Sequence, residues 1–195
     1  MDDLQGDVLM NPLDLHSVRK CHECATLGVD QVPSYGDPGS RLMIIGQNPG
    51  HQEVKEGRPF IGPSGELVDY LLDEIGLDRN EIYIANAVKC GTVGNRAPHP
   101  EEAATCWKTW LHEEIRQVKP DVILLLGKVA WQAVVQGRFP FQHNSTCKNK
   151  RFVFICSWHP SYCLRTNQPE KFVMDIGATV ARALLDTEDK DGEGN

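Results

Sequence analysis

Residues 41–46 read Arg-Leu-Met-Ile-Ile-Gly, and residues 47–50 continue with Gln-Asn-Pro-Gly. A short apolar run that ends in glycine and leads into polar turn residues is typical of a buried strand followed by a loop. Three further short runs predict strands, at Glu81 to Ala85, Asp121 to Leu126 and Arg151 to Cys156. These four runs define the sheet that we expect.

Between and after the expected strands, apolar residues recur at helical spacing. The segments are Ser64 to Ile75, Pro100 to Val118, Lys128 to Gln136 and Glu170 to Leu185. Strands that alternate with helices favour a parallel sheet covered by helices on both faces. The sequence therefore predicts the α/β class, as a three-layer αβα domain on a four-stranded parallel sheet.

The formal net charge of −7 is concentrated at the two ends of the 195-residue chain. Residues 1–7 contribute −3 and residues 186–195 contribute −4, so residues 8–185 are neutral overall. Neither end has the apolar content to form a core. We therefore expect a single domain over residues 1–185, which includes an acidic N-terminal end, followed by an acidic, disordered tail.

Composition and hydropathy exclude two classes of protein. Apolar residues make up 41% of the chain and charged residues 24%, which is typical of a globular domain and not of a disordered or fibrous chain. The longest apolar run, Val122 to Leu126, is far too short to cross a bilayer, and Met1-Asp2-Asp3 does not begin a signal peptide. We expect a soluble, cytoplasmic protein that does not bind membranes.

Four segments follow the expected strands: residues 46–50, 86–90, 127–128 and 157–160. All of them except residues 127–128 contain amide or imidazole side chains. In open α/β sheets the ligand site lies beyond the carboxyl ends of the strands. Amide and imidazole groups suit the recognition of a polar heterocycle, so these segments predict a binding site. The alternative is that they are ordinary polar loops.

Four of the seven cysteines form a pattern. Cys21 and Cys24 make a Cys-x-x-Cys pair before the first expected strand, Cys90 follows the second strand, and Cys106 lies sixteen residues later. Four thiolates suit a zinc ion or an iron–sulfur cluster, and a Cys-x-x-Cys pair can also perform redox chemistry. The spacing alone leaves these alternatives open.

Six motifs stand in a characteristic order: Gly46-Gln-Asn-Pro-Gly50, Gly57-Arg-Pro-Phe60, Ser64-Gly-Glu-Leu67, Val88-Lys-Cys90, Asn95-Arg96 and His159-Pro-Ser161. Over about residues 21–185 the chain resembles the family 4 uracil-DNA glycosylases. The resemblance implies a base excision repair enzyme that hydrolyses the N-glycosidic bond of uracil in DNA, leaving free uracil and an abasic site. Two alternatives stay open: a relative acting mainly on hypoxanthine or xanthine, and a non-catalytic protein that binds damaged DNA.

The resemblance also implies roles for the cysteines and for the residues at the strand ends. Cys21, Cys24, Cys90 and Cys106 would hold a structural [4Fe–4S] cluster, which we favour over zinc. Phe60 would stack on the flipped uracil, and Asn86 would pair with its N3–H and O4. His159 would donate a hydrogen bond to O2, where negative charge develops as the base leaves. Gly46 and Gln47 would complete the base-binding set.

The first motif departs from the family 4 pattern, which usually has Glu at position 47 and Ala at position 48. Here the residues are Gln47 and Asn48, and neither can act as a conventional general base. Asn48 instead matches the asparagine of the mismatch-directed and single-strand-selective glycosylases. We expect Asn48 to position the attacking water and Gln47 to contact the base through its backbone.

The stretch Ser161 to Arg165 resembles the loop by which the family enters the minor groove of DNA. Tyr162 or Leu164 would fill the gap left by the flipped base, and Arg165 would contact a phosphate. Between Asp121 and Glu170 there is no acidic residue, which leaves cations well suited to face phosphate. We expect a monomer that acts on DNA containing deaminated bases, at the nucleoid.

Overall fold

Four apolar runs form the centre of the sheet, as the sequence predicts. They are β2 (Leu42–Gly46), β3 (Tyr83–Asn86), β4 (Val122–Leu126) and β6 (Val153–Ser157), and all their residues are buried. The strands are parallel in the order β3-β2-β4-β6. This computed structural model describes residue 18, residues 21–24 and residues 30–192. The expectation for residues 1–7 lies outside the described residues.

The sheet has six strands, so the prediction of four was too low. β1 (Tyr35–Gly36) pairs antiparallel with β3 at one edge, and β5 (Ser145–Lys148) pairs antiparallel with β6 at the other. β1 contains only two residues. β5 has the sequence Ser-Thr-Cys-Lys, which alternates between half-buried and exposed positions. Short or polar edge strands lack the apolar run that revealed the central four.

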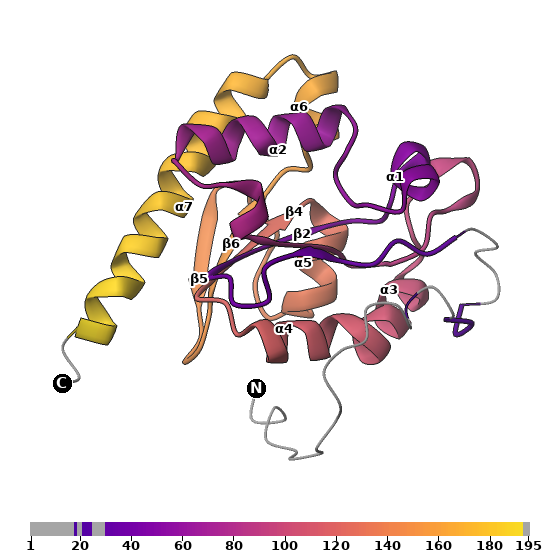
Figure 1. Ribbon diagram of the computed structural model, residues 1–195, viewed down its shortest axis with the longest axis horizontal. Helices are drawn as coiled ribbons and strands as arrows, with labels where there is room; N and C mark the ends of the chain where they lie inside the picture. The colour runs from indigo at the N-terminus through magenta and orange to yellow at the C-terminus, as the bar shows by residue number, and fades with distance from the viewer. Residues whose placement is uncertain (1–17, 19–20, 25–29, 193–195) are drawn as a thin grey trace.

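Helices cover both faces of the sheet, which confirms the three-layer αβα architecture (Figure 1). One face is covered by α2 (Pro63–Glu74), α6 (Pro160–Arg165) and α7 (Pro169–Gly192), whose apolar side chains pack on Leu42 and Ile44. The other is covered by α4 (His112–Val118) and α5 (Lys128–Val135), which pack on Met43 and Ile45. Alternate residues of β2 thus serve opposite cores.

The expected helix from Pro100 to Val118 is continuous but changes its winding. It consists of α3 (Pro100–Cys106), the π-helical segment η5 (Trp107–Leu111), and α4. The extra residue per turn in a π segment rotates the side chains that follow it. Within the described residues, four short helices were not expected from the sequence: α1 (His51–Glu56), η3 (Arg79–Glu81), η4 (Val93–Asn95) and α6.

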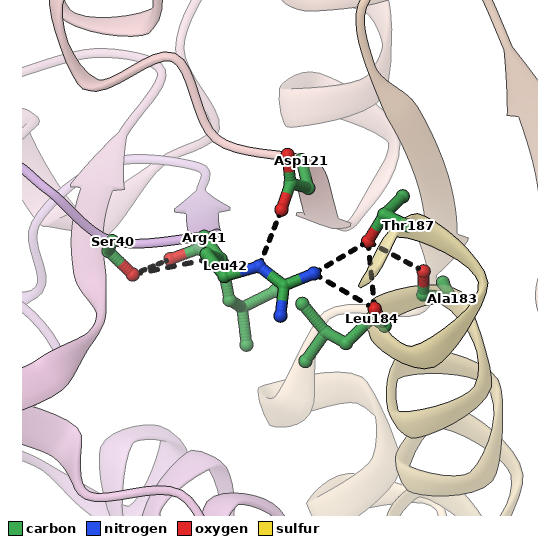
Figure 2. A network of polar contacts seen from close by, with 7 residues as sticks. All are labelled: Ser40, Arg41, Leu42, Asp121, Ala183, Leu184 and Thr187. Carbon is green, nitrogen blue, oxygen red and sulfur yellow. Dashed lines mark hydrogen bonds and ion pairs between the residues drawn. The ribbon is translucent and has the colours of Figure 1, made fainter. Parts of the chain in front are cut away.

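The last helix extends further than its apolar pattern predicts. α7 continues through Gly192, so helical backbone reaches into the acidic segment that we expected to be an unstructured tail. Figure 2 shows how Arg41 binds this helix at the start of β2: its guanidinium donates to the Leu184 carbonyl and the Thr187 hydroxyl, and pairs with Asp121. No described helix, α7 included, is long and apolar enough to cross a bilayer.

The Arg41 contacts should contribute to stability, because one guanidinium joins the start of β2, the start of β4 and the end of α7. We expect Arg41→Ala to lower the free energy of unfolding by about 1–2 kcal/mol, since charge-assisted hydrogen bonds are lost. Urea unfolding measures this value. Lys171→Ala is the control, because Lys171 makes only an exposed i,i+4 pair with Asp175, worth less than about 0.5 kcal/mol. Equal losses in the two variants would contradict the assignment.

Candidate functional site

A cavity of about 590 Å³ lies at the carboxyl edge of the central strands. This volume suits a small aromatic ligand with part of its scaffold. The cavity collects six of the residues that the sequence singled out, and they come from four separate segments: Gln47, Asn48, Phe60, Asn86, His159 and Arg165. The convergence agrees with the rule that ligands bind beyond the strand ends of open α/β sheets.

Asn86 and Phe60 line the cavity, and Gly46 lies against both of their side chains without lining the cavity itself. Gly46 ends β2 and pairs in register with Asn86, which ends β3. A Cβ atom at position 46 would lie 2.4 Å from Phe60 Cζ and 2.5 Å from Asn86 Oδ1, so only glycine fits. Asn86 is buried, and its Nδ2 has no hydrogen-bond partner within the described part of the chain. A buried amide without a partner is unfavourable unless a ligand supplies one.

Phe60 is held in an unusual backbone conformation by two charged residues. Its φ angle is +54°, which is uncommon for a bulky side chain. Glu53 accepts the Phe60 N–H and the Gly50 N–H, one on each carboxylate oxygen. Arg79 donates to the carbonyls of Pro59 and Phe60, each at 2.8 Å. No local pattern in the sequence predicts this role of Glu53.

Glu53 lines the cavity but is occupied as an acceptor. Burial raises the pKa of its carboxyl, while the backbone N–H groups of Gly50 and Phe60 oppose that rise. Because each oxygen already accepts a backbone hydrogen bond, this carboxylate ties two loops together. Glu53 is therefore poorly placed to replace the general base that positions 47 and 48 lack.

His159 is a neutral ring with a fixed tautomer. Burial, followed by the nearby charge of Arg165, lowers its pKa to about 4. Its Nδ1 accepts the backbone N–H of Ser161 at 3.2 Å and lies 2.9 Å from the Ser161 hydroxyl. A neutral imidazole that accepts at Nδ1 carries its proton on Nε2. His159 lines the cavity close to Phe60, with ring centroids 6.3 Å apart.

Asn48 and Gln47 are hydrogen-bonded to each other. Gln47 Nε2 donates to Asn48 Oδ1 at 3.1 Å, and Asn48 Nδ2 donates to the Pro49 carbonyl at 3.1 Å and to Thr92 Oγ1 at 3.4 Å. The Thr92 hydroxyl donates to the Arg96 carbonyl, so it must accept from Asn48. These contacts fix the orientation of the Asn48 amide and leave one lone pair of Oδ1 available. No local sequence pattern predicts the contact of Thr92 with Asn48.

The segment after His159 is a short helix and not the loop that we expected. Tyr162 and Leu164 project from α6 with 41% and 38% of their surface exposed, and they do not line the cavity. Arg165, at the end of the same helix, does line it. The DNA-binding roles of these three residues stay predictions.

The four patterned cysteines lie close together beside the strand ends. Cys90 and Cys106 belong to one small buried cluster, and Cys24 packs against it. Burial raises the pKa of the Cys90 thiol to about 12, with further contributions from Cys106, Cys21 and Cys24. Such mutual electrostatic effects require short distances between the thiols. Among the described residues, however, no three His, Cys, Asp or Glu side chains are arranged to hold one metal ion.

Two N–H groups point at these sulfur atoms. Trp110 Nε1 donates to Cys21 Sγ at 3.3 Å, and the Lys89 backbone N–H donates to Cys106 Sγ at 3.5 Å. Trp110 lies in the π segment η5, directly after Cys106. Hydrogen bonds to ligand sulfurs are a usual feature of iron–sulfur sites.

A buried ion pair lies next to the cysteine region, because Lys89 directly precedes Cys90. Lys89 Nζ lies 2.5 Å from Glu114 Oε2 and 2.9 Å from Ser34 Oγ, and Lys89 is only 1% exposed. Ser34 in turn donates to Glu114 Oε1 at 2.7 Å. Removing one partner of a buried pair is strongly destabilising. This pair therefore fixes the segment between β3 and Cys90 to α4.

Four parallel central strands with a polar cavity of about 590 Å³ at their carboxyl edge define an α/β protein suited to binding a flat heterocycle with part of its scaffold. The chain belongs to the uracil-DNA glycosylase superfamily: the family model of that description matches residues 33–177. This finding confirms the family resemblance and the fold class that the sequence predicts.

Curated relatives agree with this membership. A Type-4 uracil-DNA glycosylase of Thermotoga maritima is 36% identical over 159 residues, which cover 78% of this chain and 82% of the relative. A Type-4 uracil-DNA glycosylase of Saccharolobus solfataricus is 38% identical over 61% of this chain and 57% of its own length. A Type-5 uracil-DNA glycosylase of Pyrobaculum aerophilum is 30% identical over 80% of this chain and 76% of its own length.

The lowered pKa of His159 predicts how stability depends on pH. The unfolded chain takes up a proton near pH 6.5, whereas the buried ring resists protonation down to about pH 4. Acid therefore favours the unfolded state, and stability falls as the pH drops through this window. We expect His159→Gln to flatten the slope of unfolding free energy against pH by up to about 1.4 kcal/mol per pH unit.

Urea unfolding at several pH values between 4 and 7 measures the slope. His99→Gln is the matched control, because His99 is exposed at the start of α3. An unchanged slope in His159→Gln would contradict the buried neutral ring.

Proposed function

We propose that this protein is a DNA repair enzyme that hydrolyses the N-glycosidic bond between uracil and deoxyribose, releasing uracil and leaving an abasic site. The main observation is the buried, unpartnered Nδ2 of Asn86 in the wall of a cavity that His159 also lines. Names of relatives at 30–38% identity support uracil as the substrate.

Recognition of the base follows from the hydrogen-bonding capacity of Asn86. The target base must leave the stack to enter the cavity. The Asn86 amide can then accept from uracil N3–H and donate to O4 through Nδ2. Cytosine offers the opposite pattern at both atoms and would leave the buried amide unpaired, which selects against it. Phe60 supplies the apolar face beside this edge.

Departure of the base is assisted by the neutral His159. Cleavage of the bond leaves positive charge on the sugar and negative charge on the uracil, partly at O2. A hydrogen bond from Nε2–H to O2 strengthens as this charge develops, because the site is shielded from water. Ser161 keeps the ring in the donor tautomer. The water that attacks the sugar transfers one proton to solvent, and the uracil anion takes up a proton after release.

We assign the positioning of water to Asn48. Asn48 lines the cavity, and Gln47 occupies one lone pair of its Oδ1. An amide oxygen can orient water but cannot take its proton. We also assign Gln47 a role beyond the backbone contacts that we expected, because its Nε2 donates to Asn48 Oδ1 and would orient that amide.

The DNA duplex would lie against α6. Tyr162 and Leu164 are exposed apolar groups next to the cavity histidine, which suits a wedge that fills the gap in the base stack. Arg165 would pair with a phosphate beside the flipped nucleotide.

The four cysteines fit an iron–sulfur cluster better than a zinc ion. Four thiols gather in one place, and two N–H groups face their sulfurs, as is usual for the ligands of an iron–sulfur cluster. Cys21, Cys24, Cys90 and Cys106 would hold the cluster, which would supply a structural link between the N-terminal segment, β3 and α3.

The function is tested with labelled DNA duplexes that contain uracil, hypoxanthine or xanthine. We expect alkali-labile abasic sites to form fastest on uracil. Faster formation of abasic sites on hypoxanthine or xanthine than on uracil would contradict uracil as the main substrate. Binding to any of these duplexes without an abasic product would contradict catalysis.

The Gln47–Asn48 pair makes a specific kinetic prediction. Asn48→Ala should lower the single-turnover rate by about 10- to 100-fold, because the water loses its acceptor. Gln47→Glu alone should not raise the rate above that of the wild type, since a carboxylate would face Asn48 Oδ1 and repel it. The double variant Gln47→Glu/Asn48→Ala recreates the family 4 pattern and removes that repulsion. It should exceed Asn48→Ala by about tenfold or more, because a general base is regained.

The rates are measured at several pH values with saturating enzyme. The double variant should show a rate that rises with pH through the carboxylate pKa, and the wild type should not. A wild-type rate in Asn48→Ala would contradict the role of Asn48.

Cluster binding makes a separate prediction. The purified protein should contain about four iron and four sulfide per chain and absorb visible light as thiolate-bound iron does. Cys90→Ser should abolish this absorption and lower Tm by at least roughly 5 °C, since a domain of this size loses about 2–4 °C per kcal/mol. Cys147→Ser is the control, because Cys147 lies outside the pattern and is half-buried. Stoichiometric zinc without iron would overturn the cluster.

A further inference from the structure

His143 does not line the cavity, yet it contacts the residue directly before the cavity histidine. Its Nδ1 accepts the backbone N–H of Trp158 at 3.1 Å. Its ring lies almost parallel to the Trp158 indole, with centroids 3.9 Å apart and an interplanar angle of 7°. Trp158 also packs against Tyr162, at a centroid distance of 5.3 Å. One side chain therefore touches both the backbone and the ring of the residue that precedes His159.

The position of His143 is itself fixed by the β5 edge of the sheet. The next residue, Asn144, has a φ of +56°, a left-handed conformation that asparagine tolerates. The Asn144 N–H donates to the Cys156 carbonyl of β6 at 2.8 Å, and its side chain accepts from Thr179 of α7 at 2.7 Å. β6 and α7 thus hold the turn from which His143 extends.

The hydrogen bond to Trp158 requires a neutral ring. An imidazole that accepts at Nδ1 carries its single proton on Nε2. Burial lowers the pKa of His143, with Asp175 raising it and Lys171 lowering it from α7, so the acceptor is available at neutral pH. The Nε2 atom is buried and has no partner among the described residues. An unpaired buried N–H is unfavourable, so the contacts with Trp158 must compensate for it.

We propose that His143 is a positioning residue for base excision, which holds the Trp158 backbone so that His159 keeps its place in the cavity. This inference rests on the proposed function of the cavity. β6 ends at Ser157 and α6 begins at Pro160, so Trp158 and His159 are the two residues that connect them. The N-terminal half of this connection is fixed by His143 and the C-terminal half by Ser161, through Nδ1 of His159.

Three variants separate the hydrogen bond from the packing. His143→Phe keeps a flat ring against Trp158 but removes the acceptor. His143→Asn places an amide oxygen where Nδ1 lies, and His143→Gln extends its amide towards the Nε2 position instead. We expect His143→Phe and His143→Gln to lower the single-turnover rate of uracil excision by about 10- to 100-fold, because small misplacements of a catalytic group are costly. The rate of His143→Asn should remain within about threefold of the wild-type rate, since the acceptor is retained.

The concentration of DNA at half-saturation should change by less than about twofold in all three variants, because a misplaced His159 affects the chemical step and leaves substrate binding intact. Thermal unfolding checks that each variant is folded. A wild-type rate in both His143→Phe and His143→Gln would overturn the proposal. An equal loss of rate in His143→Asn and His143→Gln would also overturn it. A loss confined to DNA affinity would also overturn it.

A readout that needs no substrate tests the contact directly. The Trp158 amide should exchange with deuterium faster in His143→Phe and His143→Gln than in the wild type and His143→Asn. Equal exchange in all four proteins overturns the inference. A wild-type protein that excises no uracil overturns the proposed function instead, so the two failures can be distinguished.

Discussion

Four buried strands end at the same edge of the sheet, and the groups of the cavity are placed by that edge. Gly46 and Asn86 are register partners at the ends of β2 and β3, and Ser157 pairs with Leu126 at the ends of β6 and β4. The spacing between neighbouring strands is set by backbone hydrogen bonds and varies little. Asn86 at the end of β3 and His159 after β6 therefore line the same cavity. The absence of a side chain at Gly46 keeps that space open.

The remaining wall of the cavity is not part of the sheet and needs its own support. Phe60 lies in a connection between α1 and α2, and its left-handed conformation is strained by roughly 1–3 kcal/mol. Glu53 and Arg79 bind its N–H and carbonyl groups from opposite sides. Gly65 allows the close approach, since a Cβ there would lie 1.9 Å from the Phe60 carbonyl oxygen. The Phe60 ring is thus fixed in place, which reduces the ordering that ligand binding would require.

The sequence was sufficient for the central strands and for most of the cavity because both leave local signals. β2 and β4 are apolar runs buried on both faces, and Asn86 and His159 directly follow or end such runs. The missed features are contacts between residues far apart in the chain. Thr92 binds Asn48 from 44 positions away. A single polar residue in a loop has no periodicity, so its partner becomes visible only when the chain is folded.

The same limit applies to edges and buried charges. β5 was missed because its half-exposed Ser-Thr-Cys-Lys sequence is that of a loop, yet it carries the turn that positions His143. Lys89 was recognised only as part of a motif before Cys90. Its ammonium is buried against Glu114, 25 positions later. Sequence patterns register such a lysine as a surface residue, because lysine is almost never fully buried without a partner.

The first motif is better understood as a pair of residues than as a missing carboxylate. Gln47 donates to the Asn48 oxygen, and the Asn48 nitrogen is committed to Pro49 and Thr92. A carboxylate at 47 could not make this contact, because two acceptors would face each other. An amide at 47 therefore belongs with an amide at 48, and a carboxylate at 47 belongs with a small residue there. In the amide pair no group takes the proton of water, so catalysis must depend more strongly on the departing base. Under the proposed function, the neutral His159 would meet that demand, because its Nε2–H can donate a hydrogen bond to the uracil as negative charge develops on it.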